Sequence, residues 1–194
     1  MNRIERTSLM TLEAYAKARP EFRARVLSHK KNRTLALGPN VTLVFEDEMT
    51  VRYQVQEMLR VEKTFEEQGI LDELEAYNPL IPDGTNWKAT MLIEFPDADE
   101  RKRRLGELRD VEHHVVARID GEPPVVAVAD EDLERSNAEK TSAVHFLRFE
   151  LPDAARVALR AGAGLAFGVD HPGYRAEAIV GDDIRRSLLA DLDR

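Results

Sequence analysis

The chain has 194 residues, of which 43% are hydrophobic and 33% charged, and its formal net charge is −8. This length and apolar fraction predict a folded protein with one well-buried core rather than a disordered chain. Because the chain contains no cysteine, it cannot itself carry a disulfide, a thiolate nucleophile, a zinc finger or a cysteine-ligated iron–sulfur cluster. No apolar run approaches the roughly 18 residues of a membrane span, and the N-terminal sequence MNRIERTSLM lacks a secretory core. We therefore expect no membrane association and a cytoplasmic location.

Charge is unevenly distributed along the sequence. Residues 1–40 carry a net charge of +6, and the remainder carries −14. The overall acidity argues against general nucleic-acid binding, which relies on neutralising phosphates. The basic segment is either a solvated helix surface or a region that attracts an acidic partner.

The N-terminal part of the chain is predicted to be mainly helical. Apolar residues at helical spacing predict helices over 11–19 and 21–31, separated at Pro20, which lacks an amide proton. Two short apolar runs flank the turn sequence GPN at 38–40 and predict a β-hairpin.

A long helix is predicted to follow this hairpin. Thr50 is its candidate N-cap, and the helix is expected to run to Gln68, with Gly69 as the left-handed residue that ends it. A shorter helix is predicted over residues 70–77.

The C-terminal part of the chain is predicted to be rich in strands. Apolar runs of β type occupy residues 88–95, 111–119, 124–129, 143–151 and 164–170. Charged or amphipathic helices are predicted over 97–108, 152–161 and 181–192, with a polar loop over 130–140. A helix-rich part over about 1–80 and a β-rich part over about 86–194 predict one α+β domain, 1–194, with mostly antiparallel strands.

Glu62 occupies an unexpected position in the predicted long helix. At about 100° per residue it falls near the centre of an apolar stripe. The members of that stripe are Val51, Val55, Met58, Leu59, Val61 and Phe65. A buried carboxylate without a partner is unfavourable. Glu62 therefore needs an ion pair with a residue such as Arg23 or Arg33, exposure near the helix end, or a functional role.

Three histidines lie where an imidazole can bind a metal. Strand alternation places His113 and His145 on the apolar faces of their predicted strands, and His171 lies at a sharp turn. Glu62 with two of these histidines would supply a carboxylate and two imidazoles, which bind Fe(II), Mn(II) or Zn(II). No metal-ligand spacing motif such as HExxH is present to show that they converge.

Other catalytic signals are weak. Asp170 and His171 form a candidate general base, with Tyr174 of the same turn as acid. The sequence contains no Walker A loop, no GxGxxG and no GxSxG elbow. The segment NPLIPDGTNW is predicted to be an ordered loop with Trp87 buried.

Nearly the whole chain resembles an uncharacterised bacterial family, DUF3501. The segments that carry the resemblance are FEDEMTVRYQVQEMLRVEKTFEEQGILDELEAYNPLIP followed by ATMLIEF, the opening YAKARPEFRARVLSHKKNRTLALGPNVTLVFED, the run VHFLRFEL and the turn DHPGY. The resemblance implies a single-domain cytoplasmic protein, often encoded near rubrerythrin and an iron–sulfur oxidoreductase. Such a setting implies peroxide detoxification or electron transfer that involves iron.

Two functional hypotheses of different class follow. In the first, the chain is an accessory protein that binds a partner in a rubrerythrin-type redox or oxidative-stress system. In the second, it is a carboxylate/histidine metalloprotein, or an enzyme of that kind, with a divalent metal such as iron as cofactor. A third alternative is a small-molecule site between the helical and β parts.

Overall fold

Helices dominate the first part of the structure and antiparallel sheets the rest, which confirms the predicted α+β class. The structure is a computed structural model, and it describes residues 3–133, 135–137 and 139–192. In chain order the elements are η1 (Arg6–Ser8), α1 (Leu12–Lys31), β1 (Thr34–Leu37), β2 (Val41–Glu46), α2 (Glu48–Glu62), α3 (Glu67–Tyr77), η2 (Asn78–Leu80), β3 (Asn86–Ile93), α4 (Ala98–Glu107), η3 (Val111–His114), β4 (Val115–Ile119), β5 (Val125–Val126), β6 (Val128–Ala129), β7 (Val144–Glu150), α5 (Asp153–Arg160), β8 (Leu165–His171), β9 (Tyr174–Ile179) and α6 (Asp182–Leu192). The division of the chain into one domain stays a prediction.

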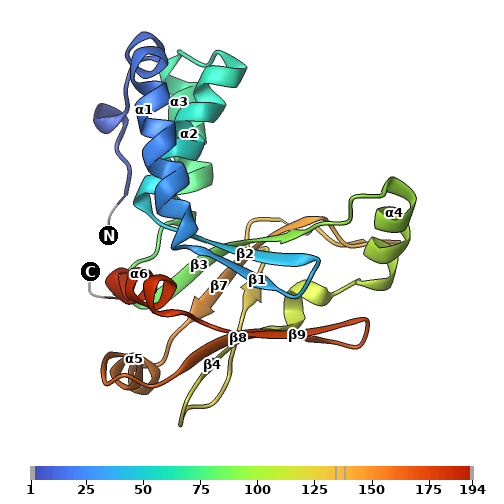
Figure 1. Ribbon diagram of the computed structural model, residues 1–194. Coiled ribbons are helices and arrows are strands. Elements are labelled where there is room, and N and C mark those ends of the chain that lie inside the picture. Colours follow the sequence, from blue (N-terminus) through green and yellow to red (C-terminus); the bar gives the residue numbers. More distant parts are fainter. Residues whose placement is uncertain (1–2, 134, 138, 193–194) are drawn as a thin grey trace.

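Two antiparallel sheets pack face to face and form a sandwich (Figure 1). The strand order is β1-β2-β3-β7-β6 in the first sheet and β5-β4-β8-β9 in the second. Phe167 of β8 lies between the sheets, with its ring centroid 4.9 Å from that of Phe45 and 5.1 Å from that of Phe149. Trp87 is fully buried, as predicted, and its ring centroid lies 5.7 Å from that of Phe167. This aromatic group is therefore central to the main core.

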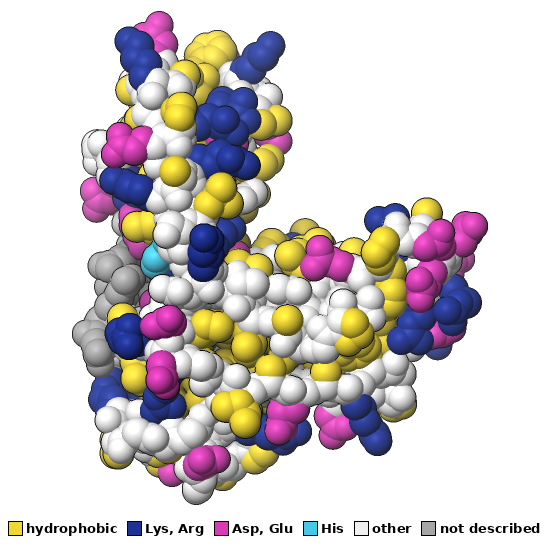
Figure 2. Space-filling view, viewed as in Figure 1, with side chains coloured by type: hydrophobic (Ala, Val, Ile, Leu, Met, Phe, Trp, Pro, Cys, Tyr) yellow, Lys and Arg dark blue, Asp and Glu magenta, His cyan; other side chains and the backbone are white. Residues whose placement is uncertain are grey.

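Helices α1, α2 and α3 form an arm that stands on one end of the sandwich (Figures 1 and 2). Val51, Val55 and Leu59 of α2 pack with Ile70 and Leu74 of α3 in a second core, which confirms the inner part of the predicted stripe. At the other end of the sandwich α4 projects to the same side as the arm, so the molecule has an L-shaped outline (Figure 2). Among the described residues, no helix has the length and apolar character needed to cross a membrane.

Glu57 joins α1 to α2 within the arm. Its carboxylate accepts hydrogen bonds from Arg19 (2.7 and 2.9 Å), the Tyr15 hydroxyl (2.7 Å) and Arg60 (3.2 Å). These donors, Arg19 foremost, hold the pKa of Glu57 at about 2, below its ordinary value of 4.5. Because the folded-state pKa is lowered, this contact stabilises the arm above pH 4.5, and its contribution is lost as the pH falls towards about 2.

Pro20 does not interrupt α1, so the predicted break is wrong. The helix is continuous over Leu12–Lys31. Pro20 cannot donate to the carbonyl of Ala16, but both residues are exposed, so water can hydrogen-bond to that carbonyl. On the buried side, the rings of Tyr15 and Phe22 make an edge contact with centroids 6.3 Å apart, so packing holds the helix together across the proline.

The predicted long helix is in fact two helices. Asp47, not Thr50, is the N-cap of α2: its side chain accepts a hydrogen bond from the Thr50 amide (3.0 Å), and the Thr50 hydroxyl accepts one from the Asp47 amide (2.9 Å). The helix ends at Glu62 because Lys63 adopts the left-handed conformation, with a φ of 56°. Gly69 therefore lies inside α3 rather than at a helix end.

Three strand predictions also need correction. Residues 111–114 form a 3₁₀ turn, and β4 begins only at Val115. The predicted strand over 124–129 divides at Ala127 into β5, which joins the second sheet, and β6, which joins the first. Strand β9, which pairs with β8, has no counterpart among the predicted strands. The predicted hairpin of β1 and β2 is confirmed.

Candidate functional site

The four predicted metal ligands do not converge in the structure. Glu62 is exposed in the last turn of α2, where the helix leaves the arm's core, and the adjacent Val61 and Phe65 are 61% and 73% exposed. Arg33, one of the predicted partners of Glu62, is buried elsewhere and pairs with Asp191 at 2.5 Å. Of the alternatives for Glu62, the structure thus shows exposure near the end of its helix and not a carboxylate that faces the core.

His113 is exposed, contrary to the strand-face prediction. It belongs to the 3₁₀ turn η3, in which the two-residue alternation of a strand does not apply. The same turn directs the neighbouring side chain of Glu112 inwards, and Glu112 is only 2% exposed. A carboxylate thus takes the buried position that was expected for an imidazole.

His171 is buried, but backbone groups occupy both of its ring nitrogens. Nδ1 accepts a hydrogen bond from the Gly173 amide (3.0 Å), so Nε2 carries the proton and donates to the carbonyl of Arg109 (3.0 Å). Burial lowers the pKa of His171, which favours this neutral form. His171 therefore fixes the turn between β8 and β9.

The predicted acid–base group at this turn is not assembled. Asp170 is paired with Arg175 at 3.2 Å rather than with the imidazole. The hydroxyl of Tyr174 donates to the carbonyl of Leu37 at 2.5 Å and so links β9 to β1.

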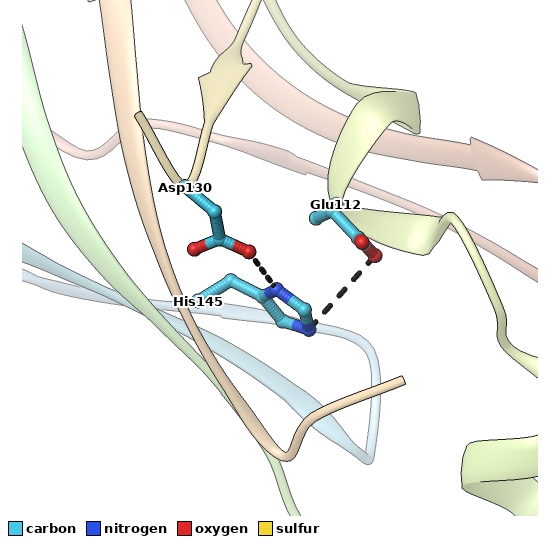
Figure 3. A group of neighbouring side chains, drawn as sticks. All are labelled: Glu112, Asp130 and His145. Atoms are coloured by element: carbon cyan, nitrogen blue, oxygen red, sulfur yellow. Dashed lines mark hydrogen bonds and ion pairs between the residues drawn. The ribbon is translucent and has the colours of Figure 1, made fainter. Parts of the chain in front are cut away.

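His145 lies in a cluster of metal-ligating groups (Figure 3). Its side chain is fully buried on the inward face of β7, as strand alternation predicts. Nδ1 lies 2.6 Å from Asp130 Oδ2, and Nε2 lies 2.9 Å from Thr141 Oγ1 and 3.9 Å from Glu112 Oε2. Within the described part of the chain, Glu112, Asp130 and His145 form the only group of at least three histidine or acidic residues with ligand atoms within 4.8 Å of one another.

Three separate elements bring these side chains together. Glu112 comes from η3, Asp130 directly follows β6, and His145 lies on β7 (Figure 3). The pairing of β6 with β7 continues into Asp130, whose amide donates to the carbonyl of Phe146 at 2.8 Å. Asp130 itself has a φ of 49°, a left-handed conformation that aspartate tolerates better than most residues. We refer to Glu112, Asp130, Ser136, Thr141 and His145 as the His145 cluster.

Asp130 sets the tautomer of His145. Its Oδ2 accepts the Nδ1 proton, while Oδ1 accepts hydrogen bonds from the Phe146 amide (2.9 Å) and from Arg135 (3.2 Å). Nε2 points to the other side of the cluster, where it lies beside Thr141 Oγ1 and the carbonyl oxygen of Ser142. Arg135 offsets the charge of Asp130, which leaves this carboxylate as an orienting group.

Glu112 has no arginine or lysine partner among the described residues. Its Oε1 accepts a hydrogen bond from the Ser136 hydroxyl, and its Oε2 lies 3.2 Å from Thr141 Oγ1. The two hydroxyl oxygens are 2.9 Å apart. A carboxylate at this depth is unfavourable in its charged form unless a cation lies beside it.

A groove of about 440 Å³ lies beside the cluster, between α3, η2 and the outer face of the first sheet. Arg135 and Phe146 link the two features. Both residues line the groove, the Arg135 guanidinium carbon lies 4.6 Å from the Phe146 ring centroid, and Arg135 also binds Asp130. The groove lies between the helical and β parts, the position considered for a small-molecule site.

Comparison with known proteins gives a family and a solved structure. A family described as "Protein of unknown function (DUF3501)" has a sequence model that matches residues 3–192. The fold is also similar to the crystal structure of a novel protein of unknown function from Burkholderia pseudomallei K96243. The two chains are 54% identical, the match covers 98% of this chain and 99% of the other, and the TM-score is 0.93. No curated protein matches the sequence.

Proposed function

Since the chain belongs to the DUF3501 family of proteins of unknown function, we propose a function from side-chain geometry: the His145 cluster binds a divalent first-row metal ion such as Fe(II), Mn(II) or Zn(II). The observation that carries this proposal is the buried Glu112 carboxylate, which has no arginine or lysine partner among the described residues and lies 3.9 Å from Nε2 of the His145 imidazole. A metal ion between the two groups would supply the missing positive charge.

Three atoms are suited to bind the ion directly. His145 Nε2, Thr141 Oγ1 and Glu112 Oε2 form a triangle with sides of 2.9, 3.2 and 3.9 Å. The point equidistant from the three atoms lies about 2.0 Å from each, which is the usual bond length from zinc to nitrogen or oxygen. The carbonyl oxygen of Ser142 lies 3.1 Å from Nε2 and is a fourth candidate donor.

Metal binding leaves the polar groups of the cluster with partners. The Thr141 hydroxyl can turn its proton to Ser136 Oγ, 2.9 Å away, and Ser136 continues to donate to Glu112 Oε1. Asp130 keeps its hydrogen bond to Nδ1 and acts as the carboxylate that orients a metal-bound histidine. The ion thus replaces the hydrogen bonding of Thr141 to Glu112 and Nε2 without leaving a buried group unpaired.

The untagged protein is expected to bind one Mn(II) or Zn(II) per chain in isothermal titration calorimetry. Glu112→Gln removes the charged ligand but keeps the side-chain shape, and we expect it to weaken binding by at least about tenfold. At a hundredfold excess over Kd, the ion should stabilise the fold by about 2.7 kcal/mol and raise Tm by roughly 5–10 °C. Glu62→Gln is the matched control, because that glutamate is exposed. Substoichiometric binding, or equal affinity in the Glu112 and Glu62 variants, would end the proposal.

A second function is favoured by the exposed end of the arm. Val61, Phe65 and Leu71 are 61%, 73% and 43% exposed, and α1 of the arm carries six lysine or arginine residues against two glutamates. Apolar side chains together with positive charge suit a partner with an acidic surface and an apolar patch. We propose that the arm docks such a partner, and the resemblance points to rubrerythrin or an iron–sulfur oxidoreductase.

Immobilised protein is expected to retain one of these two partners at low and moderate salt. Phe65→Asp places a charge in the apolar contact and should abolish retention, whereas Ile179→Asp should not change it, because Ile179 is 83% exposed but lies on the sandwich. Failure to retain either partner, or an equal loss in both variants, would count against docking by the arm.

A further inference from the structure

Lys88 brings an amine without a partner into the groove between α3 and the first sheet. It lies on the outer face of β3, opposite Glu46 of β2 and Arg148 of β7 in the strand register. The side chain is half-buried and makes no hydrogen bond or ion pair with the described residues. The nearby carboxylates of Glu131 and Glu150 bind Arg148 instead, at 2.8 and 2.5 Å.

This environment makes the Lys88 amine easier to deprotonate than that of an exposed lysine. Burial, followed by the charge of Arg148, lowers the pKa of Lys88, and the charges of Glu131, Asp83 and Glu150 oppose this shift without cancelling it. The neutral amine is the nucleophilic form of lysine, and lysines in such surroundings are those that attack carbonyl groups.

The rest of the groove combines apolar surface with charged side chains, since Glu73, Glu75, Glu131, Asp132, Arg135 and Arg148 line it together with Lys88. Tyr77, Leu80 and Phe146 line it with apolar surface. On the α3 side, Glu73 Oε2 is buried and has no hydrogen-bond partner within the described part of the chain. Burial raises the pKa of Glu73, with the charges of Glu62 and Asp72 adding to the effect. Glu73 is therefore suited to hydrogen-bond a polar group of the ligand.

We propose that this groove binds a small aldehyde with an apolar body and that Lys88 captures it as an imine. The Lys88 nitrogen attacks the carbonyl carbon and forms the C–N bond, while the carbonyl oxygen takes up the amine proton through water. Loss of water from this carbinolamine gives the imine, and addition of water returns the free amine and the aldehyde, so no oxidant or reductant is consumed. The volume of about 440 Å³ admits an aromatic ring between the apolar side chains.

The test uses the full-length protein, 4-hydroxybenzaldehyde near neutral pH, and cyanoborohydride to trap the imine as a stable amine. Peptide mass spectrometry is expected to find the hydroxybenzyl group on Lys88, at a rate at least about tenfold above that on the exposed Lys102. Lys88→Arg keeps the charge and should abolish this labelling, whereas Lys102→Arg should not change it.

A competition experiment separates groove binding from simple amine reactivity. 4-Hydroxybenzyl alcohol has the same ring but cannot form an imine, so it should slow the labelling of Lys88 and leave that of Lys102 unchanged. Labelling spread over the lysines according to exposure would overturn the proposal. Labelling of Lys88 that the alcohol does not slow would overturn it as well.

Discussion

Replacement of His145 by alanine is expected to lower the free energy of unfolding by about 3–5 kcal/mol and to abolish metal binding. The ring is fully buried and lies against the carboxylates of Asp130 and Glu112. Its removal deprives Asp130 of the hydrogen bond from Nδ1, removes the only ring ligand of the cluster and leaves a cavity. For a chain of this length, the corresponding loss in Tm is roughly 6–20 °C.

His113→Ala is the matched control for this experiment. His113 is exposed and directly follows Glu112, so its removal should change stability by less than about 0.5 kcal/mol. Urea unfolding of the wild type and the two variants measures the difference. If the two substitutions have equal effects, the account of the cluster is wrong. If His145→Ala is destabilised yet binds metal as the wild type does, the cluster supports the fold and the ion binds elsewhere.

Arg33→Met is expected to cost a similar amount, about 3–5 kcal/mol, because it removes the buried cation that lies 2.5 Å from the Asp191 carboxylate. Arg33 is 1% exposed and follows Asn32, the C-cap of α1. Its guanidinium donates to the carbonyls of Phe45 and Glu46 (2.9 Å each), to the Ser187 hydroxyl (2.9 Å) and to Asp191 Oδ2 (2.5 Å). One side chain thus joins the base of the arm to β2 and to the C-terminal helix α6.

Two further variants give this prediction its controls. Adding Asp191→Leu to Arg33→Met removes the buried carboxylate that Arg33 binds and should restore part of the lost stability. Arg186→Met removes an ion pair with Asp183 that is 77% and 71% exposed, so its cost should stay below about 0.5 kcal/mol. Chemical denaturation of the set would refute the role of Arg33 if its replacement cost no more than that of Arg186.

The parts of the fold that could be predicted are those whose signal is local. The alternation in β7 correctly placed His145 inside, and the GPN turn correctly defined the first hairpin. The break predicted at Pro20 is wrong because the buried side chains of α1 pack together across the proline. That packing depends on the three-dimensional structure and is not visible in the sequence. The end of α2 was missed because Lys63, rather than a glycine, adopts the left-handed conformation.

Of the candidate site, only the inward position of His145 could be predicted from the sequence. The sequence contains 36 acidic residues, and spacing alone cannot show which of them meet His145. Asp130 does so through the pairing of β6 with β7. The apolar run over 124–129 predicts one continuous strand instead, which hides the short strand β6. Glu112 does so through a 3₁₀ turn that interrupts the apparent strand over 111–119. The argument that a buried glutamate needs a partner applies to Glu112, which is buried, and not to Glu62, which is exposed.

Anomalous diffraction from crystals of the untagged protein grown with Mn(II) tests the central claim most directly. We predict an anomalous peak about 2 Å from Glu112 Oε2, Thr141 Oγ1 and His145 Nε2, with Asp130 still bound to Nδ1. If the crystals show no peak at this position, and these atoms remain joined by hydrogen bonds alone, the cluster is not a metal site.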